Sequence, residues 1–119
     1  MCNSAVCHGP AAIADVKLSN GKYLIEGHQV TGFSNAEEDG VGLSKYMPFM
    51  LEDVLKKNSG GKYVKAEQDW GEKIVVENGG KLITGQNPAS GMFLSSLRSF
   101  GALELPDDTN ALFAMFAII

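Results

Sequence analysis

The stretch AVCHGPAA, residues 5–12, places a Cys-His pair at the end of a short apolar run and follows it with Gly-Pro. The apolar residues predict that 3–7 form the last part of a strand, and Pro10 at an early helical position predicts a helix through 11–14. The stretch therefore predicts a strand, a sharp turn and a helix. A cysteine placed there is either an inert buried side chain or a nucleophile held on the turn.

Length and composition favour one small globular domain. The chain has 119 residues, of which 45% are hydrophobic and 20% charged. Its net charge of -4 argues against a nucleic-acid partner, because a phosphate backbone requires clustered Lys and Arg. The apolar run 111–119 is too short to span a membrane and is either a core element or an exposed adhesive end. Two cysteines and no apparent signal segment predict a cytoplasmic protein.

Strand and helix patterns alternate along the rest of the chain. Asn20-Gly21 predicts a hairpin, and Asn35 begins a pattern typical of a capped helix with an acidic first turn. Further elements are expected as strands at 29–31, 63–65, 74–76 and 82–84, the last two joined in a hairpin through 78–80, and as helices at 48–57 and after 87–90. This alternation predicts an α/β fold with few strands, in which the strand before Cys7 is central.

Four motifs in this order resemble the ThiJ/PfpI family, in its branch of glyoxalase III (D-lactate dehydratase) and heat-shock chaperones. They are AVCHGPAA at 5–12, HQVTGFSNAEED at 28–39, MPFMLEDVL at 47–55 and LITGQNPAS at 82–90. The resemblance implies a partial flavodoxin-like sandwich, the carboxy-terminal half of a ThiJ/PfpI domain. Residues 1–90 are expected to form that part of the domain, and 91–119 a divergent tail that is helical or poorly packed.

The resemblance also implies a function. The parent activity is a glutathione-independent glyoxalase that converts methylglyoxal, a small aldehyde, into D-lactate without a cofactor. The family's amino-terminal half carries an essential acidic residue beside the thiol, and we expect that half to be absent and the activity to be impaired. The alternative is a non-enzymatic stress chaperone or a cysteine redox-sensing module. A homodimer is left open.

Cys7, His8, Gly9 and Glu38 are the candidate site residues. A helix that begins just after Cys7 is expected to lower the pKa of its thiol and make it the nucleophile, in preference to Cys2. His8 is the candidate base and, by the resemblance, Glu38 orients it. The competing interpretation of Glu38 is a capping box, Asn35-x-x-Glu38. The Gly9 amide is the candidate oxyanion donor, with a plain turn glycine as the alternative.

No metal site is expected. Cys2, Cys7, His8 and His28 lack the paired spacing typical of zinc ligands, and His28 is expected to be an exposed hairpin residue. Asn87-Pro88 is interpreted first as a structural turn before a helix.

Overall fold

The computed structural model describes residues 3–99 and 112–116, which contain a four-stranded sheet in the order β2-β3-β1-β4. The strands are β1 (Asn3–Cys7), β2 (Ile74–Glu77), β3 (Leu82–Gly85) and β4 (Leu112–Phe116). β1 pairs in parallel with both β3 and β4, whereas β2 runs antiparallel to β3. A strand with parallel neighbours on both sides is typically an apolar run, and β1 is apolar over its last three residues, 5–7. Its predicted central position is confirmed.

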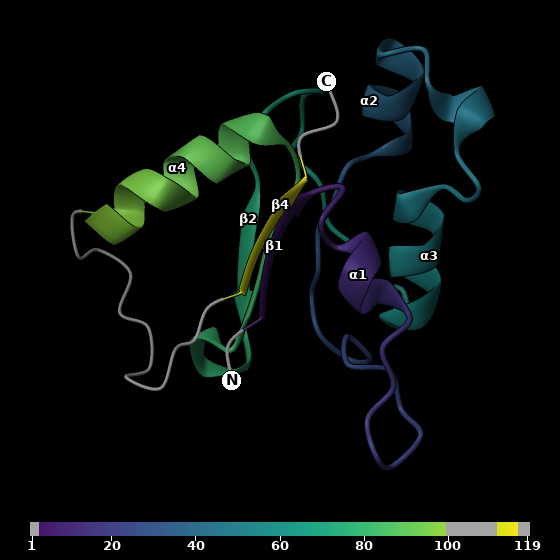
Figure 1. The fold of residues 1–119 in the computed structure, drawn as a ribbon, viewed down its shortest axis with the longest axis vertical. Coiled ribbons are helices and arrows are strands. Elements are labelled where there is room, and N and C mark those ends of the chain that lie inside the picture. Colours follow the sequence, from purple (N-terminus) through teal and green to yellow (C-terminus); the bar gives the residue numbers. More distant parts are fainter. Residues whose placement is uncertain (1–2, 100–111, 117–119) are drawn as a thin grey trace.

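Helices cover the sheet on both faces (Figure 1). α4 lies along one face, and α1 and α3 lie along the other. The bounds of the helices are α1 (Ala11–Ala14), α2 (Asn35–Gly40), α3 (Leu51–Asn58) and α4 (Pro88–Ser99), with short 3₁₀ turns η1 (Ser44–Tyr46) and η2 (Asn78–Gly80). This is a mixed α/β arrangement of three layers, which confirms the predicted fold class. Among the described residues, no helix is long and apolar enough to cross a membrane.

Both predicted tight turns form where small residues allow a left-handed backbone. Gly21, with φ of 82°, closes a turn flanked by an antiparallel bridge between Lys17 and Tyr23. Between β2 and β3, Asn78, Gly79 and Gly80 all have positive φ. Asn and Gly tolerate this conformation best, so the sequence of the turn determines the predicted hairpin.

Three predicted elements differ from the structure. The segments 29–31 and 63–65 are not strands, because only Val30 and Tyr63 make a parallel bridge. The helix expected at 48–57 begins later, at Leu51. Met47 is extended, as residues before a proline usually are, and Met50 is extended as well, so the helical conformation starts only after them.

Apolar side chains fill the space on both sides of the sheet. Ile25, Val30 and Leu55 are fully buried, and Leu94 of α4 is 1% exposed. Gly85 allows close packing at the end of β3, since a Cβ there would lie 3.1 Å from a methyl of Val6. The same Cβ would lie 3.2 Å from the Cβ of Ser90, so α4 packs directly on the end of β3. α4 also extends across residue 90. The expected division of the chain into residues 1–90 and 91–119 stays a prediction.

The apolar carboxy-terminal run reaches the sheet. Residues 112–116 lie beside β1 on the side away from β3. The run was expected to be either a core element or an exposed adhesive end. Its described part, 112–116, is a strand of the sheet. Residues 100–111 and 117–119, on which the rest of the expected tail falls, are outside the described residues.

Candidate active site

Cys7 lies at a sharp bend where β1 ends. Its φ is 62°, in the left-handed region that residues with a Cβ rarely adopt and that is typically maintained by the surrounding structure. The carbonyl of Cys7 accepts a hydrogen bond from the amide of Phe33 at 2.9 Å, which ties the bend to the next segment. α1 follows after a single turn, with Pro10 as its N-cap residue. The predicted strand, turn and helix are confirmed.

The bend brings three of the predicted residues into one row. Cys7 Sγ lies 3.5 Å from His8 Nδ1, and His8 Nε2 lies 2.7 Å from Glu38 Oε2. A carboxylate only accepts hydrogen bonds, so we assign the ring hydrogen to Nε2, which donates to Glu38. Nδ1 is then free to accept the hydrogen of the Cys7 thiol. This is the geometry of a nucleophile, a base and an orienting carboxylate.

Aromatic rings hold the imidazole in place. The Phe33 ring lies 4.4 Å from the His8 ring, centroid to centroid, and the Trp70 ring packs on Phe33 edge-on at 5.5 Å. The His8 side chain is 10% exposed and that of Glu38 is 5% exposed. The row is thus largely shielded from water, which strengthens its hydrogen bonds.

The electrostatics of the thiol differ from the expectation. The pKa of Cys7 is raised to about 11, mainly by burial and to a smaller extent by the negative charges of Glu37 and Glu38. The backbone amide of His8 lowers it, but by less than burial raises it. The expected lowering of the Cys7 pKa was wrong, because burial and the two neighbouring carboxylates outweigh the His8 amide.

Gly9 is part of the turn. Its amide donates to the carbonyl of Val6 at 2.9 Å, so in this structure the amide is already used. The backbone amide beside the sulfur is that of His8 instead. A substrate contact by Gly9 stays a prediction.

The capping box of α2 lies one residue earlier than expected. Ser34 is the N-cap residue, and its side chain and that of Glu37 bond each other's backbone amides. The competing interpretation of Glu38, an Asn35–Glu38 capping box, was therefore wrong, and the Glu38 side chain bonds His8 instead. The sequence does contain the correct signal, since Ser34-x-x-Glu37 also matches the capping-box pattern.

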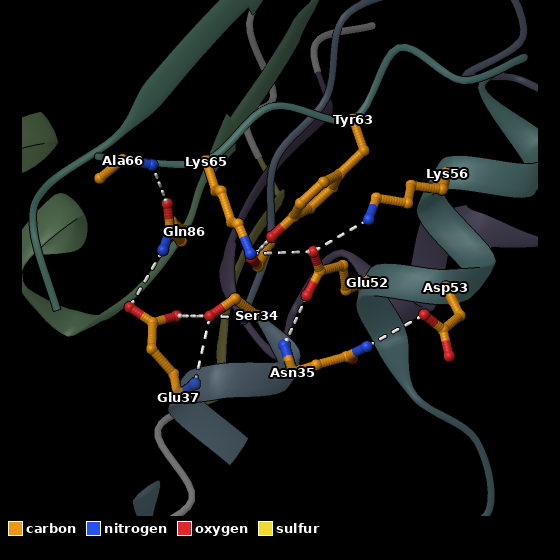
Figure 2. Close-up of polar contacts among 11 residues, drawn as sticks. Ser34, Asn35, Glu37, Glu52, Asp53, Lys56, Tyr63, Lys65, Ala66 and Gln86 are labelled. Atoms are coloured by element: carbon orange, nitrogen blue, oxygen red, sulfur yellow. Dashed lines mark hydrogen bonds and ion pairs between the residues drawn. The ribbon is translucent and has the colours of Figure 1, made fainter. Parts of the chain in front are cut away.

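Glu37 is a buried residue that the sequence interpretation missed. Its side chain is fully buried and accepts five hydrogen bonds, two of them from Ser34. Figure 2 shows its carboxylate between Ser34 and Gln86. The remaining donors are the Trp70 amide and the Asn87 side chain. Asn87 also bonds Ser90 at the start of α4, which agrees with its predicted structural role.

An apolar cavity of about 450 Å³ opens beside Cys7. Val6 and Cys7 line it from the end of β1, and five residues between Pro88 and Ser96 line it from α4. A cavity of this volume is large enough for a small molecule.

His28 takes no part in this row of residues. It is about one-third exposed and its Nδ1 lies 3.2 Å from a carboxylate oxygen of Glu77. Within residues 3–99 and 112–116, no three His, Cys, Asp or Glu side chains gather where they could hold a metal ion. Cys2 lies outside the described residues. The absence of a metal and of a cofactor stays a prediction.

Comparison with known proteins points to one group. No protein-family model matches the sequence. The chain is 37% identical over 108 residues to the glutathione-independent glyoxalase HSP31 of Saccharomyces cerevisiae, covering 85% of this chain and 43% of that protein. It is 35% identical to glyoxalase 3 of Candida albicans, covering 73% of this chain and 38% of that one. The chain thus spans less than half the length of the curated relatives that it matches.

Solved structures agree with these relatives. Rapid Encystment Protein 24 KDa of Francisella tularensis matches with a TM-score of 0.72 and 40% identity, over 85% of this chain and 43% of that one. Glyoxalase III of Candida albicans matches with a TM-score of 0.69 and 31% identity over the same shares. By sequence and by fold, most of this chain is therefore related to a part of the glutathione-independent glyoxalases, which supports the ThiJ/PfpI resemblance of its motifs.

Proposed function

We propose that this chain is the carboxy-terminal part of a glutathione-independent glyoxalase that converts methylglyoxal and water into D-lactate. The observation that carries the proposal is the row Cys7–His8–Glu38, with its contacts of 3.5 and 2.7 Å on a strained bend. The names of the related proteins support the same reaction class. We propose a cytoplasmic setting and no bound cofactor.

The chemistry begins at the sulfur of Cys7. Because burial raises its pKa to about 11, the group is a thiol near neutral pH. Attack on the aldehyde carbon of methylglyoxal therefore needs His8 Nδ1 to take the thiol hydrogen as the carbon–sulfur bond forms. The product of this step is a hemithioacetal. Glu38 holds the imidazole and stabilises the positive charge that develops on it.

The second stage moves a hydrogen between the two substrate carbons. The hydrogen leaves the carbon bound to sulfur, an enediol forms, and a proton returns to the neighbouring carbon, giving a thioester of lactate. Water then hydrolyses the thioester and restores the thiol. We assign these transfers to His8 together with an acidic residue that the family resemblance places in the amino-terminal half.

The geometry gives less support to a redox-sensing module. A sensor cysteine is typically solvent-accessible and has a lowered pKa. Cys7 is 4% exposed and its pKa is raised.

The test of the proposal is a chimera. Residues 3–90 would replace the matching segment of the Saccharomyces cerevisiae relative, and D-lactate formation from methylglyoxal would be measured. We expect turnover that disappears in Cys7→Ser, whereas the isolated chain should show little or none and should associate in light scattering. A folded chimera that forms no D-lactate, while the unaltered relative does, would rule out the proposed activity.

A further inference from the structure

Glu37 links three segments of the chain that are far apart in sequence. Its Oε2 accepts from the amide and hydroxyl of Ser34 at 3.0 and 3.1 Å, at the start of α2. Its Oε1 accepts from the Trp70 amide at 3.1 Å, from Gln86 Nε2 at 3.0 Å and from Asn87 Nδ2 at 2.9 Å. Five donors on one fully buried carboxylate hold α2, the loop at Trp70 and the end of β3 together.

Glu38 lacks such an anchor of its own. Its Oε2 bonds His8, but within the described residues its buried Oε1 has no hydrogen-bond partner. The direction of this carboxylate is therefore set by the backbone of α2, in which it follows Glu37 directly. Because Glu37 directly precedes Glu38 in α2, the bonds that hold Glu37 also fix the partner of His8.

A second path leads from Glu37 to the imidazole through aromatic rings. Trp70 has a φ of 66°, an unfavourable value for a residue with a Cβ, and the bond from its amide to Glu37 helps to hold it there. Its ring packs on Phe33, which in turn packs on His8. Glu37 thus supports the imidazole from two sides, through Glu38 and through the rings.

We propose that Glu37 is a positioning residue for the candidate active site: its carboxylate joins Ser34, Trp70 and Gln86 and so keeps His8 in the Nε2–H tautomer aimed at Glu38. The proposal rests on the proposed function of the row Cys7–His8–Glu38. It assigns to Glu37 no contact with a substrate.

The test uses the chain itself and needs no turnover. Long-range ¹H–¹⁵N spectra show which ring nitrogen of a histidine carries the hydrogen, and the chain has only two histidines. At about pH 8.5, where an ordinary imidazole is neutral, we expect His8 to be almost entirely Nε2–H. In Glu37→Gln, which is nearly isosteric but cannot accept all five bonds, the ratio of Nε2–H to Nδ1–H should fall about tenfold. The fluorescence of Trp70, the single tryptophan, should shift in the same variant.

Glu52→Gln is the matched control. Glu52 of α3 is also buried, at 2% exposure. It accepts a hydrogen bond from the amide of Asn35 in α2, the helix that contains Glu37 (Figure 2). We expect this variant to lose stability while its His8 tautomer and Trp70 emission stay as in the parent. An equal change in Glu52→Gln would mean that any loosening of α2 has the effect, and would overturn the specific role of Glu37.

Three other results also decide the matter. If Glu37→Gln does not fold, Gln86→Leu removes one of the five donors and should give a smaller change of the same sign; no change there overturns the proposal. If His8 in the parent chain is not mainly Nε2–H, the row itself is wrong and the proposed function falls with it. If the parent is Nε2–H and Glu37→Gln is unchanged, only the positioning role is lost.

Discussion

The network around Glu37 and the row Cys7–His8–Glu38 lie side by side, but they satisfy buried polar groups very differently. Glu37 accepts five hydrogen bonds, whereas the side chain of Glu38 bonds only His8 and has one buried oxygen with no partner among the residues that the structure describes. Cys7 combines a strained φ with a pKa raised to about 11. A fully bonded carboxylate stabilises the fold, whereas an incompletely bonded one is costly and is typical of a site that does chemistry.

The largest expected effect separates the two carboxylates by activity. In the chimera that forms D-lactate, Glu38→Gln should lower turnover by about 10²–10⁴-fold, because the base loses its orienting partner. Its free energy of unfolding should change by no more than about 1 kcal/mol, since only one hydrogen bond is weakened. Turnover and urea unfolding of the same preparations measure both. A variant with a normal rate and a lowered melting temperature would show that Glu38 is a structural residue.

The opposite pattern is expected at Glu37 when its carboxylate is removed. Glu37→Leu removes the acceptor of five hydrogen bonds, four of them buried, and should lower the free energy of unfolding of the chain by about 3–5 kcal/mol. Urea unfolding followed by Trp70 fluorescence measures this. The matched variant Glu38→Leu should cost clearly less. Equal losses at both positions would contradict the contrast between the network and the row.

Local sequence predicted the row better than it predicted the network. Cys7, His8 and the turn after them are adjacent in the chain, so the bend and its helix were predictable from residues 5–12. Glu38 was found through the family resemblance. Apart from Ser34, the partners of Glu37 lie 33, 49 and 50 residues away, and no local pattern shows such contacts.

The errors have the same origin. The pKa of Cys7 was expected to fall because only the following helix is visible in the sequence, whereas burial by distant segments raises it. Asn35-x-x-Glu38 and Ser34-x-x-Glu37 both match a capping box, and only the tertiary bonds of Glu37 decide between them. The structure of the carboxy-terminal run was left open because 112–116 pair with β1, more than 100 residues earlier in the chain, and no local pattern shows such pairing.

The raised pKa of Cys7 gives a prediction in alkali. At pH 7 only about one sulfur in 10⁴ is a thiolate, so alkylation of Cys7 by iodoacetamide should be slow and should speed up about tenfold per pH unit up to pH 10. Mass spectrometry of the peptide that contains Cys7 follows the reaction, with Cys7→Ser as the control for labelling of Cys2. Fast labelling of Cys7 near neutral pH, which the sequence interpretation favoured, would contradict the raised pKa of its thiol.

The same shift links stability to pH. The pKa of Cys7 is raised in the folded chain from an ordinary value of 9.0 to about 11. The unfolded chain therefore loses this proton first, so the stabilising contribution is complete below pH 9 and is lost as the pH rises towards 11. The free energy of unfolding of Cys7→Ser should therefore fall less steeply than that of the parent chain between pH 9 and pH 11.

The smallest expected effect tests a second bonded carboxylate, Glu52. Burial raises the pKa of Glu52, but the Asn35 amide together with Lys56 and Lys65 lowers it more. The pKa of Glu52 in the folded chain therefore lies below its ordinary value of 4.5. Its stabilising contribution is present above that value and is lost as the pH falls through the folded pKa. Glu52→Gln should thus lower the free energy of unfolding by about 1–3 kcal/mol at pH 7, and the difference should shrink in acid.

Asp53 provides the matched control for this measurement. It is the next residue of α3, is exposed, and bonds only the side chain of Asn35 among the contacts that the structure describes. Asp53→Asn should change the free energy of unfolding by less than about 0.5 kcal/mol, because water replaces an exposed bond easily. Urea unfolding at pH 7 and pH 3.5 compares the two variants. If Asp53→Asn costs as much as Glu52→Gln, charge at the start of α3 matters more than burial, and the number of buried bonds does not explain why some carboxylates of this chain stabilise it.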